Sequence, residues 1–165
     1  MRAGSRAPTG GGDVDPLGMD DYGAFTQRFG NLVPQALGRW GLDVRVRTDR
    51  TRYRTGQPVD VTIEIRNRLP VPVNLAIEGK RPWAWAVDGH VDASEEPLHA
   101  SHGRSRLDLR ARETLRIDQE WHGRFRRPGS PTRWVLAGPG VYEISAYVPA
   151  VGGRVEDSIT ITLEA

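Results

Sequence analysis

Apolar and polar residues alternate along most of the chain from residue 42 onward, which is the pattern of a strand with one buried and one exposed face. In 59–66, valine and isoleucine occupy every second position and Asp60, Thr62, Glu64 and Arg66 lie between them. The same period predicts further strands. We expect strands at 42–48, 59–67, 73–77, 82–87, 106–109, 114–122, 141–148 and 155–163.

Glycine and proline separate these segments. Gly56 and Pro58 precede one strong strand pattern, and Pro139 and Gly140 precede another. The regions 90–104 and 123–138 lack a clear period and are expected to be loops. Seven to nine short strands with no second helical pattern predict an all-β, immunoglobulin-like β-sandwich with antiparallel strands.

The first 41 residues differ from the rest, and the predicted division is a flexible extension over 1–41 and a sandwich domain over 42–165. Within the extension, Tyr22, Phe25, Phe29 and Leu32 recur at spacings of three and four, which favours one short amphipathic helix. This helix would cover an edge of the sandwich or dock to another protein, and a disordered segment is the remaining alternative.

Composition narrows the function classes. The chain has no cysteine, which excludes disulfides and thiolate metal sites. All but Lys80 of the 23 basic residues are arginine, and the net charge is only +2, so the pI of about 9.4 does not indicate a strong positive field. The sequence shows neither a signal-peptide pattern nor a membrane-spanning apolar stretch, and a cytoplasmic protein is expected.

The sequence favours binding over catalysis. A Gly-x-Ser-x-Gly nucleophile motif and a phosphate-binding glycine loop are both absent, so neither an enzyme nor a nucleotide cofactor is expected. His99 and His102, with Asp92, Glu95 and Glu96 nearby in the sequence, have types that could bind zinc. We interpret them, with His90 and His122, as surface histidines, and expect no metal.

The segment 123–139 combines arginines with aromatic residues and three prolines. Tryptophan and arginine contribute more binding energy at protein interfaces than most residue types. The predicted partner-binding residues are Arg124, Arg126, Arg127, Arg133 and Trp134. Arginines that pair with nearby acids, and weak nucleic-acid binding, are the alternatives for this segment. Trp83, Trp85 and Tyr142 are instead predicted to pack in the core.

Several phrases resemble the intracellular proteinase inhibitor family: Gly56-Gln57-Pro58-Val59, the strand end at 65–68, and Pro139-Gly140-Val141-Tyr142. At 110–114 the chain departs from the Pro-Gly that this family usually has. The resemblance covers 42–163 and implies an immunoglobulin-like sandwich that inhibits cytoplasmic serine proteinases.

The predicted function is therefore a non-catalytic protein-binding module, with a cytoplasmic serine proteinase as one candidate partner. A structural domain that docks to a larger assembly through Tyr22, Phe25 and Phe29 is the second possibility. Nucleic-acid binding through the arginine-rich segment is the third.

Overall fold

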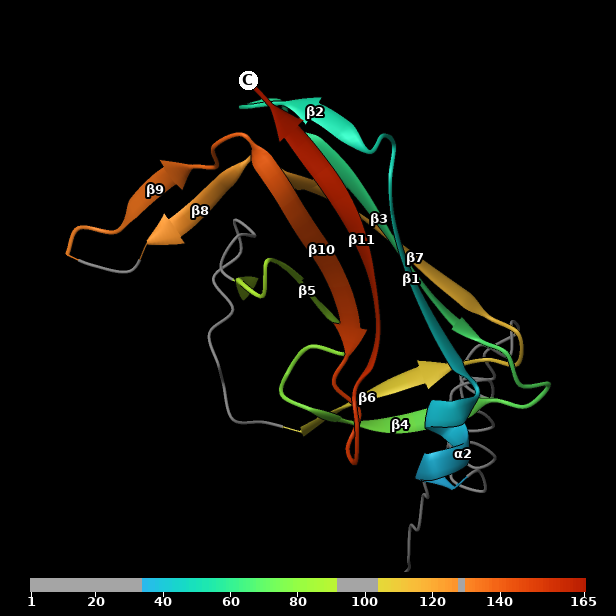
Figure 1. Ribbon diagram of the computed structural model, residues 1–165. Coiled ribbons are helices and arrows are strands. Elements are labelled where there is room, and N and C mark those ends of the chain that lie inside the picture. Colours follow the sequence, from blue (N-terminus) through green and yellow to red (C-terminus); the bar gives the residue numbers. More distant parts are fainter. Residues whose placement is uncertain (1–33, 92–103, 128–129) are drawn as a thin grey trace, which may run out of the picture.

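Two β-sheets lie face to face in the computed structural model, which describes residues 34–91, 104–127 and 130–165 (Figure 1). The first sheet has the order β1-β3-β7 and the second the order β2-β11-β10-β5. Their strands are β1 (Leu42–Thr48), β3 (Val59–Asn67), β7 (Thr114–Trp121), β2 (Arg52–Arg54), β11 (Val155–Glu164), β10 (Gly140–Val148) and β5 (Ala84–Val87).

Two antiparallel pairs extend from this sandwich. β4 (Val73–Glu78) pairs with β6 (Arg104–Leu109) at the end near the short helix α2 (Gln35–Trp40). β8 (Arg124–Arg127) pairs with β9 (Arg133–Leu136) and projects away from the two sheets at the opposite end of β10 (Figure 1).

The core fills the space between the two sheets. From β3 it receives the four apolar residues of the alternating pattern, Val59, Val61, Ile63 and Ile65, each at most 1% exposed. Across the gap it receives Ile144 from β10 and Ile161 from β11. The alternation seen in the sequence therefore does separate the buried face of β3 from its wet face.

The strand order is that of an immunoglobulin-like sandwich. β1, β3 and β7 take the places of strands A, B and E, and β5, β10 and β11 those of C, F and G. The predicted fold class is confirmed. Within the described residues there are eleven strands, more than expected. After β1 the chain crosses from the first sheet to the second, where β2 pairs with β11 in parallel.

Asn67 fixes the end of β3. Its side chain is fully buried and makes three hydrogen bonds: Nδ2 donates to the carbonyls of Val71 (2.8 Å) and Arg110 (2.8 Å), and Oδ1 accepts from the N–H of Leu69 (2.9 Å). One side-chain amide thus supplies hydrogen-bond partners to two backbone groups of the turn that contains the two prolines, and it also joins this turn to the chain before β7. Buried backbone groups need such partners because water is excluded.

Helix α2 was not predicted from the sequence, and the predicted helix within 20–33 lies outside the described residues. Gln35 holds α2 to the edge of β4: its amide nitrogen donates to the carbonyl of Asn74 and its oxygen accepts from the N–H of Ala76, both at 2.9 Å. Gly38 allows close approach, because a Cβ there would lie 2.8 Å from Leu75. The helix therefore covers a strand edge that would otherwise be open.

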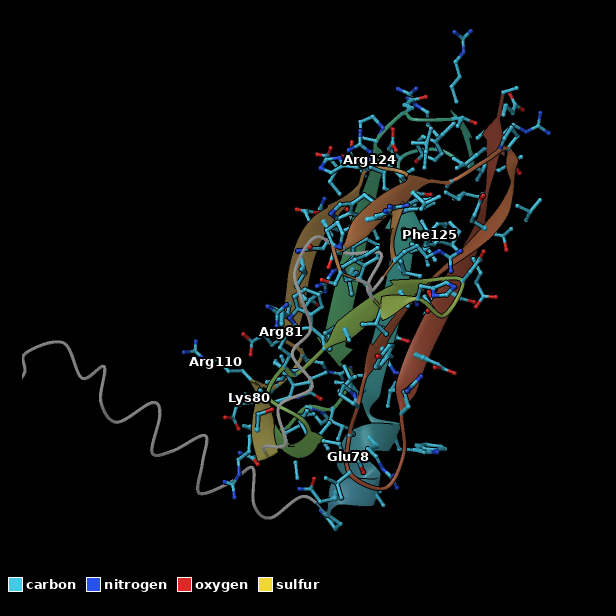
Figure 2. The ribbon with its side chains drawn as sticks, turned by 90° about the vertical axis from the view of Figure 1, so that its left-hand side faces the viewer. Glu78, Lys80, Arg81, Arg110, Arg124 and Phe125 are labelled. Atoms are coloured by element: carbon cyan, nitrogen blue, oxygen red, sulfur yellow. The ribbon has the colours of Figure 1, made fainter. Side chains whose placement is uncertain are left out.

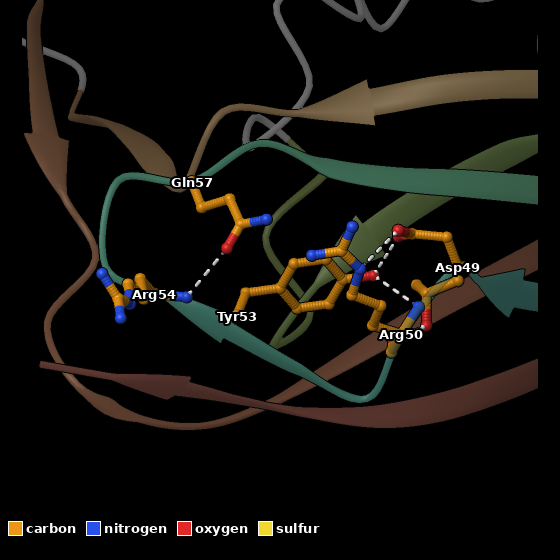
Figure 3. A network of polar contacts seen from close by, with 6 residues as sticks. Asp49, Arg50, Tyr53, Arg54 and Gln57 are labelled. Carbon is orange, nitrogen blue, oxygen red and sulfur yellow. Dashed lines mark hydrogen bonds and ion pairs between the residues drawn. The ribbon is translucent and has the colours of Figure 1, made fainter.

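Tyr53 joins β2 to the turn before it (Figure 3). Its ring is buried, and its hydroxyl donates to Asp49 and accepts from the N–H of Arg50 at 3.0 Å. Burial, followed by the hydrogen bond to the Asp49 carboxylate, raises the pKa of Tyr53 above its ordinary value near 10. In the same network, Oε1 of Gln57 accepts from the N–H of Arg54 and closes the turn into β3.

We expect Asn67→Ala to lower the free energy of unfolding by about 3 kcal/mol, because the three hydrogen bonds of a fully buried amide are lost. Urea denaturation checks this. The control is Thr62→Ala, which removes an exposed hydrogen bond to Asp118 and should cost about 0.5 kcal/mol or less. Equal losses for the two variants would contradict the role given to Asn67.

Tyr53 should also make the fold sensitive to alkali. Because its pKa is higher in the folded state, the unfolded chain loses this proton first, and the stability from the protonated hydroxyl falls as pH rises above about 10. Tyr53→Phe should flatten this fall, although it lowers stability at neutral pH. Urea denaturation between pH 8 and 11 measures it, with Tyr147→Phe as the control, and an unchanged slope in Tyr53→Phe would refute the assignment.

Candidate functional site

The hairpin β8–β9 contains all five residues that the sequence predicts for partner binding. Its register places Arg124 opposite Leu136, Arg126 opposite Trp134, and Arg127 opposite Arg133. Opposed residues share a face, and alternate residues along a strand share that face too. We define the outer face of the hairpin as Arg124, Arg126, Trp134 and Leu136, and the inner face as Phe125, Arg127, Arg133 and Val135.

The hairpin is anchored by aromatic packing at its base. The ring centroid of Phe125 lies 5.6 Å from that of Trp121 and 6.0 Å from that of Tyr142, and Trp121 and Tyr142 are 5.6 Å apart. His90 adds an edge contact to Phe125 at 5.5 Å. We call Trp121, Phe125 and Tyr142 the root cluster. A two-stranded hairpin is marginal alone, so this packing is what holds it in place.

Polar contacts fix the root cluster further. The indole N–H of Trp121 donates to the carbonyl of Arg124 at 3.0 Å, and the hydroxyl of Tyr142 donates to the carbonyl of Gly138 at 2.8 Å. The N–H of Ala137 donates to the carbonyl of Gly123 at 2.8 Å and closes the base of the hairpin. Figure 2 shows Arg124 and Phe125 together at this end of the molecule.

Large apolar side chains are exposed on and beside β9. Trp134 is 44% exposed and Leu136 51%, both on the outer face. Val135 and, just after the hairpin, Val141 are 45% and 66% exposed. Single exposed apolar residues are ordinary, but a contiguous group of them indicates an interaction surface.

The hairpin arginines differ from many others in the chain. In the part of the molecule that the structure describes, Arg124, Arg126, Arg127 and Arg133 have no ion pair with a carboxylate. Elsewhere, arginines do lie within 4.0 Å of one: Arg45, Arg47, Arg50, Arg52, Arg116 and Arg154. The alternative that the hairpin arginines pair with neighbouring acids finds no such pair among the described residues, and for the other acids of the chain it stays a prediction.

The segment 123–138 was expected to be a loop, and the structure instead forms two short strands in it. Sequence reasoning found the arginines and Trp134 but missed Val135, Leu136 and Val141. Two four-residue segments on either side of a proline-containing turn are the signal that would have indicated a hairpin. The expectations for packing hold for Trp85, which is 4% exposed, and for Tyr142, while Trp83 is half-buried against the core.

The other candidate sites considered from the sequence are a metal site and a membrane-spanning segment. His99, His102 and the acids near them lie outside the described residues. Among residues 34–91, 104–127 and 130–165, no three histidines and carboxylates come together as a metal site would require. None of the helices described there is long and apolar enough to cross a membrane.

The fold and its projecting hairpin define an immunoglobulin-like β-sandwich domain. A comparison with protein families matches residues 30–164 to the family described as "Family of unknown function (DUF7974)", and the chain belongs to that family. The matching family is thus not that of the intracellular proteinase inhibitors, and the match includes α2. Comparison with curated proteins gives no match.

Among solved structures, the chain is similar to a β-glucosidase, EmGH1, from Erythrobacter marinus, with 14% identity, a TM-score of 0.44, and coverage of 74% of this chain and 15% of the other. Alkylpurine DNA glycosylase AlkC from Pseudomonas fluorescens gives 15% identity, a TM-score of 0.46, and coverage of 76% and 31%. The CARDB domain of the PF1109 protein from Pyrococcus furiosus gives 11% identity, a TM-score of 0.42, and coverage of 74% of this chain and 94% of the other.

The chain thus spans only about one sixth of the β-glucosidases it matches. None of these likenesses transfers an activity to it, because each has low identity and a TM-score below 0.5.

If the root cluster positions the hairpin, Phe125→Ala should loosen the hairpin more than the sandwich. We expect amide hydrogen exchange to accelerate by about tenfold or more in β8 and β9 and much less in β3, because Phe125 is half-buried at the base of the hairpin and local opening there does not require the sandwich to unfold. Exchange followed by NMR measures this. Val141→Ala removes an exposed side chain nearby and serves as the control. Uniform acceleration in every strand would contradict the anchoring role.

Proposed function

We propose that this chain is a non-catalytic protein-binding module whose contact surface is the outer face of the hairpin β8–β9. The observation that carries the proposal is that Arg124 and Arg126, which have no ion pair within residues 34–91, 104–127 and 130–165, share one face with the exposed Trp134 and Leu136. Tryptophan and arginine dominate the binding energy of protein interfaces, usually near the centre of the contact.

The missing ion pairs favour binding energetically. Among the described residues, Arg124 and Arg126 have no carboxylate to release, so a partner's carboxylate is gained there without breaking an ion pair. Arginine also donates two parallel hydrogen bonds to a carboxylate, which adds orientation as well as energy. We therefore propose a partner whose contact surface is acidic around an apolar depression that accepts Trp134.

Anchoring favours binding as well. The root cluster and the hydrogen bond from Trp121 to the carbonyl of Arg124 order the hairpin before a partner arrives. A preordered surface loses less conformational entropy on association than a loose loop. This rigidity distinguishes the hairpin from an ordinary solvated loop.

Inhibition of an intracellular serine proteinase is the narrower form of this proposal. An inhibitor must present extended backbone that is rigid before the complex forms, and β8 and β9 offer extended backbone held at the base. The phrases shared with the intracellular proteinase inhibitor family support testing proteinases first. Docking through Tyr22, Phe25 and Phe29 concerns residues outside the described part and is separated by the experiment below.

The test is affinity capture from the native cytosol with full-length protein, followed by a titration of each captured partner. We expect Arg126→Gln with Trp134→Ala to weaken binding about thirtyfold or more, which corresponds to about 2 kcal/mol. Arg116→Gln with Val71→Ala is the matched control, since it removes an arginine and an exposed apolar side chain from other surfaces and should retain affinity.

Four results would count against the proposal or its narrower form. Equal affinity of the two double variants rejects the hairpin as the contact surface. Partners lost only when Tyr22, Phe25 and Phe29 become alanine indicate docking through that segment instead. Capture of nucleic acid with affinity that falls steeply as salt rises would replace protein binding by phosphate contact. Full activity of chymotrypsin and subtilisin in the presence of excess protein would argue against inhibition of these enzymes.

A further inference from the structure

A pocket lies at the far end of the sandwich from the hairpin, where α2 meets the turn between β10 and β11. It has a volume of about 240 Å³ and is open to solvent. Figure 2 shows Glu78 near this end of the molecule, remote from Arg124. The pocket is lined by Ala36, Arg39, Trp40, Gly153, Arg154 and Val155.

Arg39 is the unusual member of this lining. Its Nε is enclosed by protein and has no hydrogen-bond partner, and its guanidinium has no ion pair within the described residues. Buried polar atoms without partners are rare, and one on a charged group is costly. A negatively charged group on the remaining guanidinium nitrogens would offset that cost.

The turn beside Arg39 is shaped to hold the guanidinium. Gly152 and Gly153 both have positive φ, 84° and 149°. A Cβ on Gly152 would lie 2.8 Å from Nη1 of Arg39, and one on Gly153 would lie 2.9 Å from it. The arginine therefore lies directly against bare backbone, a position that any side chain at either glycine would obstruct.

Two further residues complete a binding surface. The guanidinium carbon of Arg154 lies 4.0 Å from the ring centroid of Tyr147, and Arg154 has an exposed ion pair of 3.7 Å with Glu156. The ring contact and this weak pair hold a second positive charge at the rim. Trp40 is 85% exposed, so it offers an apolar surface beside the two charges.

We propose that this pocket binds an acidic segment of a partner protein. A carboxylate of that segment pairs with Arg39 and Arg154, and an apolar neighbour in the same segment packs on Trp40. Charge complementarity selects the occupant, because two arginines line the pocket and Arg39 has no acidic partner in the part of the chain that the structure describes. The pocket is independent of the hairpin, so it is a second contact and not a part of the first.

The experiment titrates full-length protein with an acetylated, amidated EELEE pentapeptide and follows ¹⁵N–¹H NMR signals. The chain has five tryptophans, and Trp40→Phe identifies the indole signal of Trp40 by its absence. We expect saturable shifts of that signal and of the Arg39 Nε–H signal. The QQLQQ peptide should give no saturation, and Arg39→Gln should weaken binding about five- to tenfold, since one charge-assisted pair is lost.

Arg154→Gln provides a second variant in case Arg39→Gln disturbs α2, and it should weaken binding by a similar factor. Arg116→Gln is the control and should leave the titration unchanged. Because the hairpin is remote, both pocket variants should retain full affinity for a partner captured through Trp134.

The proposal is overturned if EELEE and QQLQQ shift Trp40 alike, or if neither variant weakens binding. Shifts of the Trp134 signal without those of Trp40 would assign the peptide to the hairpin. Movement of the Trp40 signal on simple dilution of the protein would identify a second copy of this chain as the occupant. Equal shifts with sodium phosphate would indicate a site for small anions.

Discussion

The rest of the structure depends on the packing of apolar side chains between the two sheets. Trp121 belongs to this core and also contacts the hairpin. Trp121 is 1% exposed and is among the largest fully buried side chains. Burying an indole requires a partner for its N–H, and the carbonyl of Arg124 supplies it. The core therefore determines where β8 begins, and the same ring packs on Phe125 and Tyr142. The direction of the hairpin is in this sense a consequence of core packing.

Strand edges are treated differently at the two ends of the molecule. The edge of β4 is covered by the amide of Gln35 and by Val151, whose N–H donates to the carbonyl of Ala76. The hairpin, in contrast, pairs with no other strand among the described residues. Arginines can protect an open edge from aggregation, and that role alone would explain a charged hairpin. It does not explain Trp134 and Leu136 on the same face, because exposed apolar residues increase the tendency to associate. The pairing of the two residue types favours a selective contact surface.

Sequence reasoning succeeded where one physical signal decides the structure. β3 has one buried and one exposed face, so apolar and polar residues alternate along it, and the turn before Tyr142 marks where the following strand begins.

The hairpin was missed because all four residues of β9 are exposed, so its sequence does not alternate between apolar and polar residues. Helix α2 has six residues and no side-chain cap, and it depends on Gln35 reaching β4, a contact 39 residues away in the sequence. β2 is only three residues long and pairs with the end of β11. Such long-range contacts leave no local pattern.

The two proposed contacts lie at opposite ends of β10, and this placement affects how they can work together. β10 has nine residues, so its ends are roughly 27 Å apart at the usual rise of a strand. It is paired on both sides, with β11 and with β5, and its inward residues Ile144 and Ala146 are fully buried. A strand so constrained has no second packing arrangement within easy reach, and sites this far apart without shared partners contribute additively. The hairpin and the pocket would then act as two independent attachment points on a rigid spacer. A partner that engaged both would gain affinity through effective concentration, without any conformational change in the sandwich.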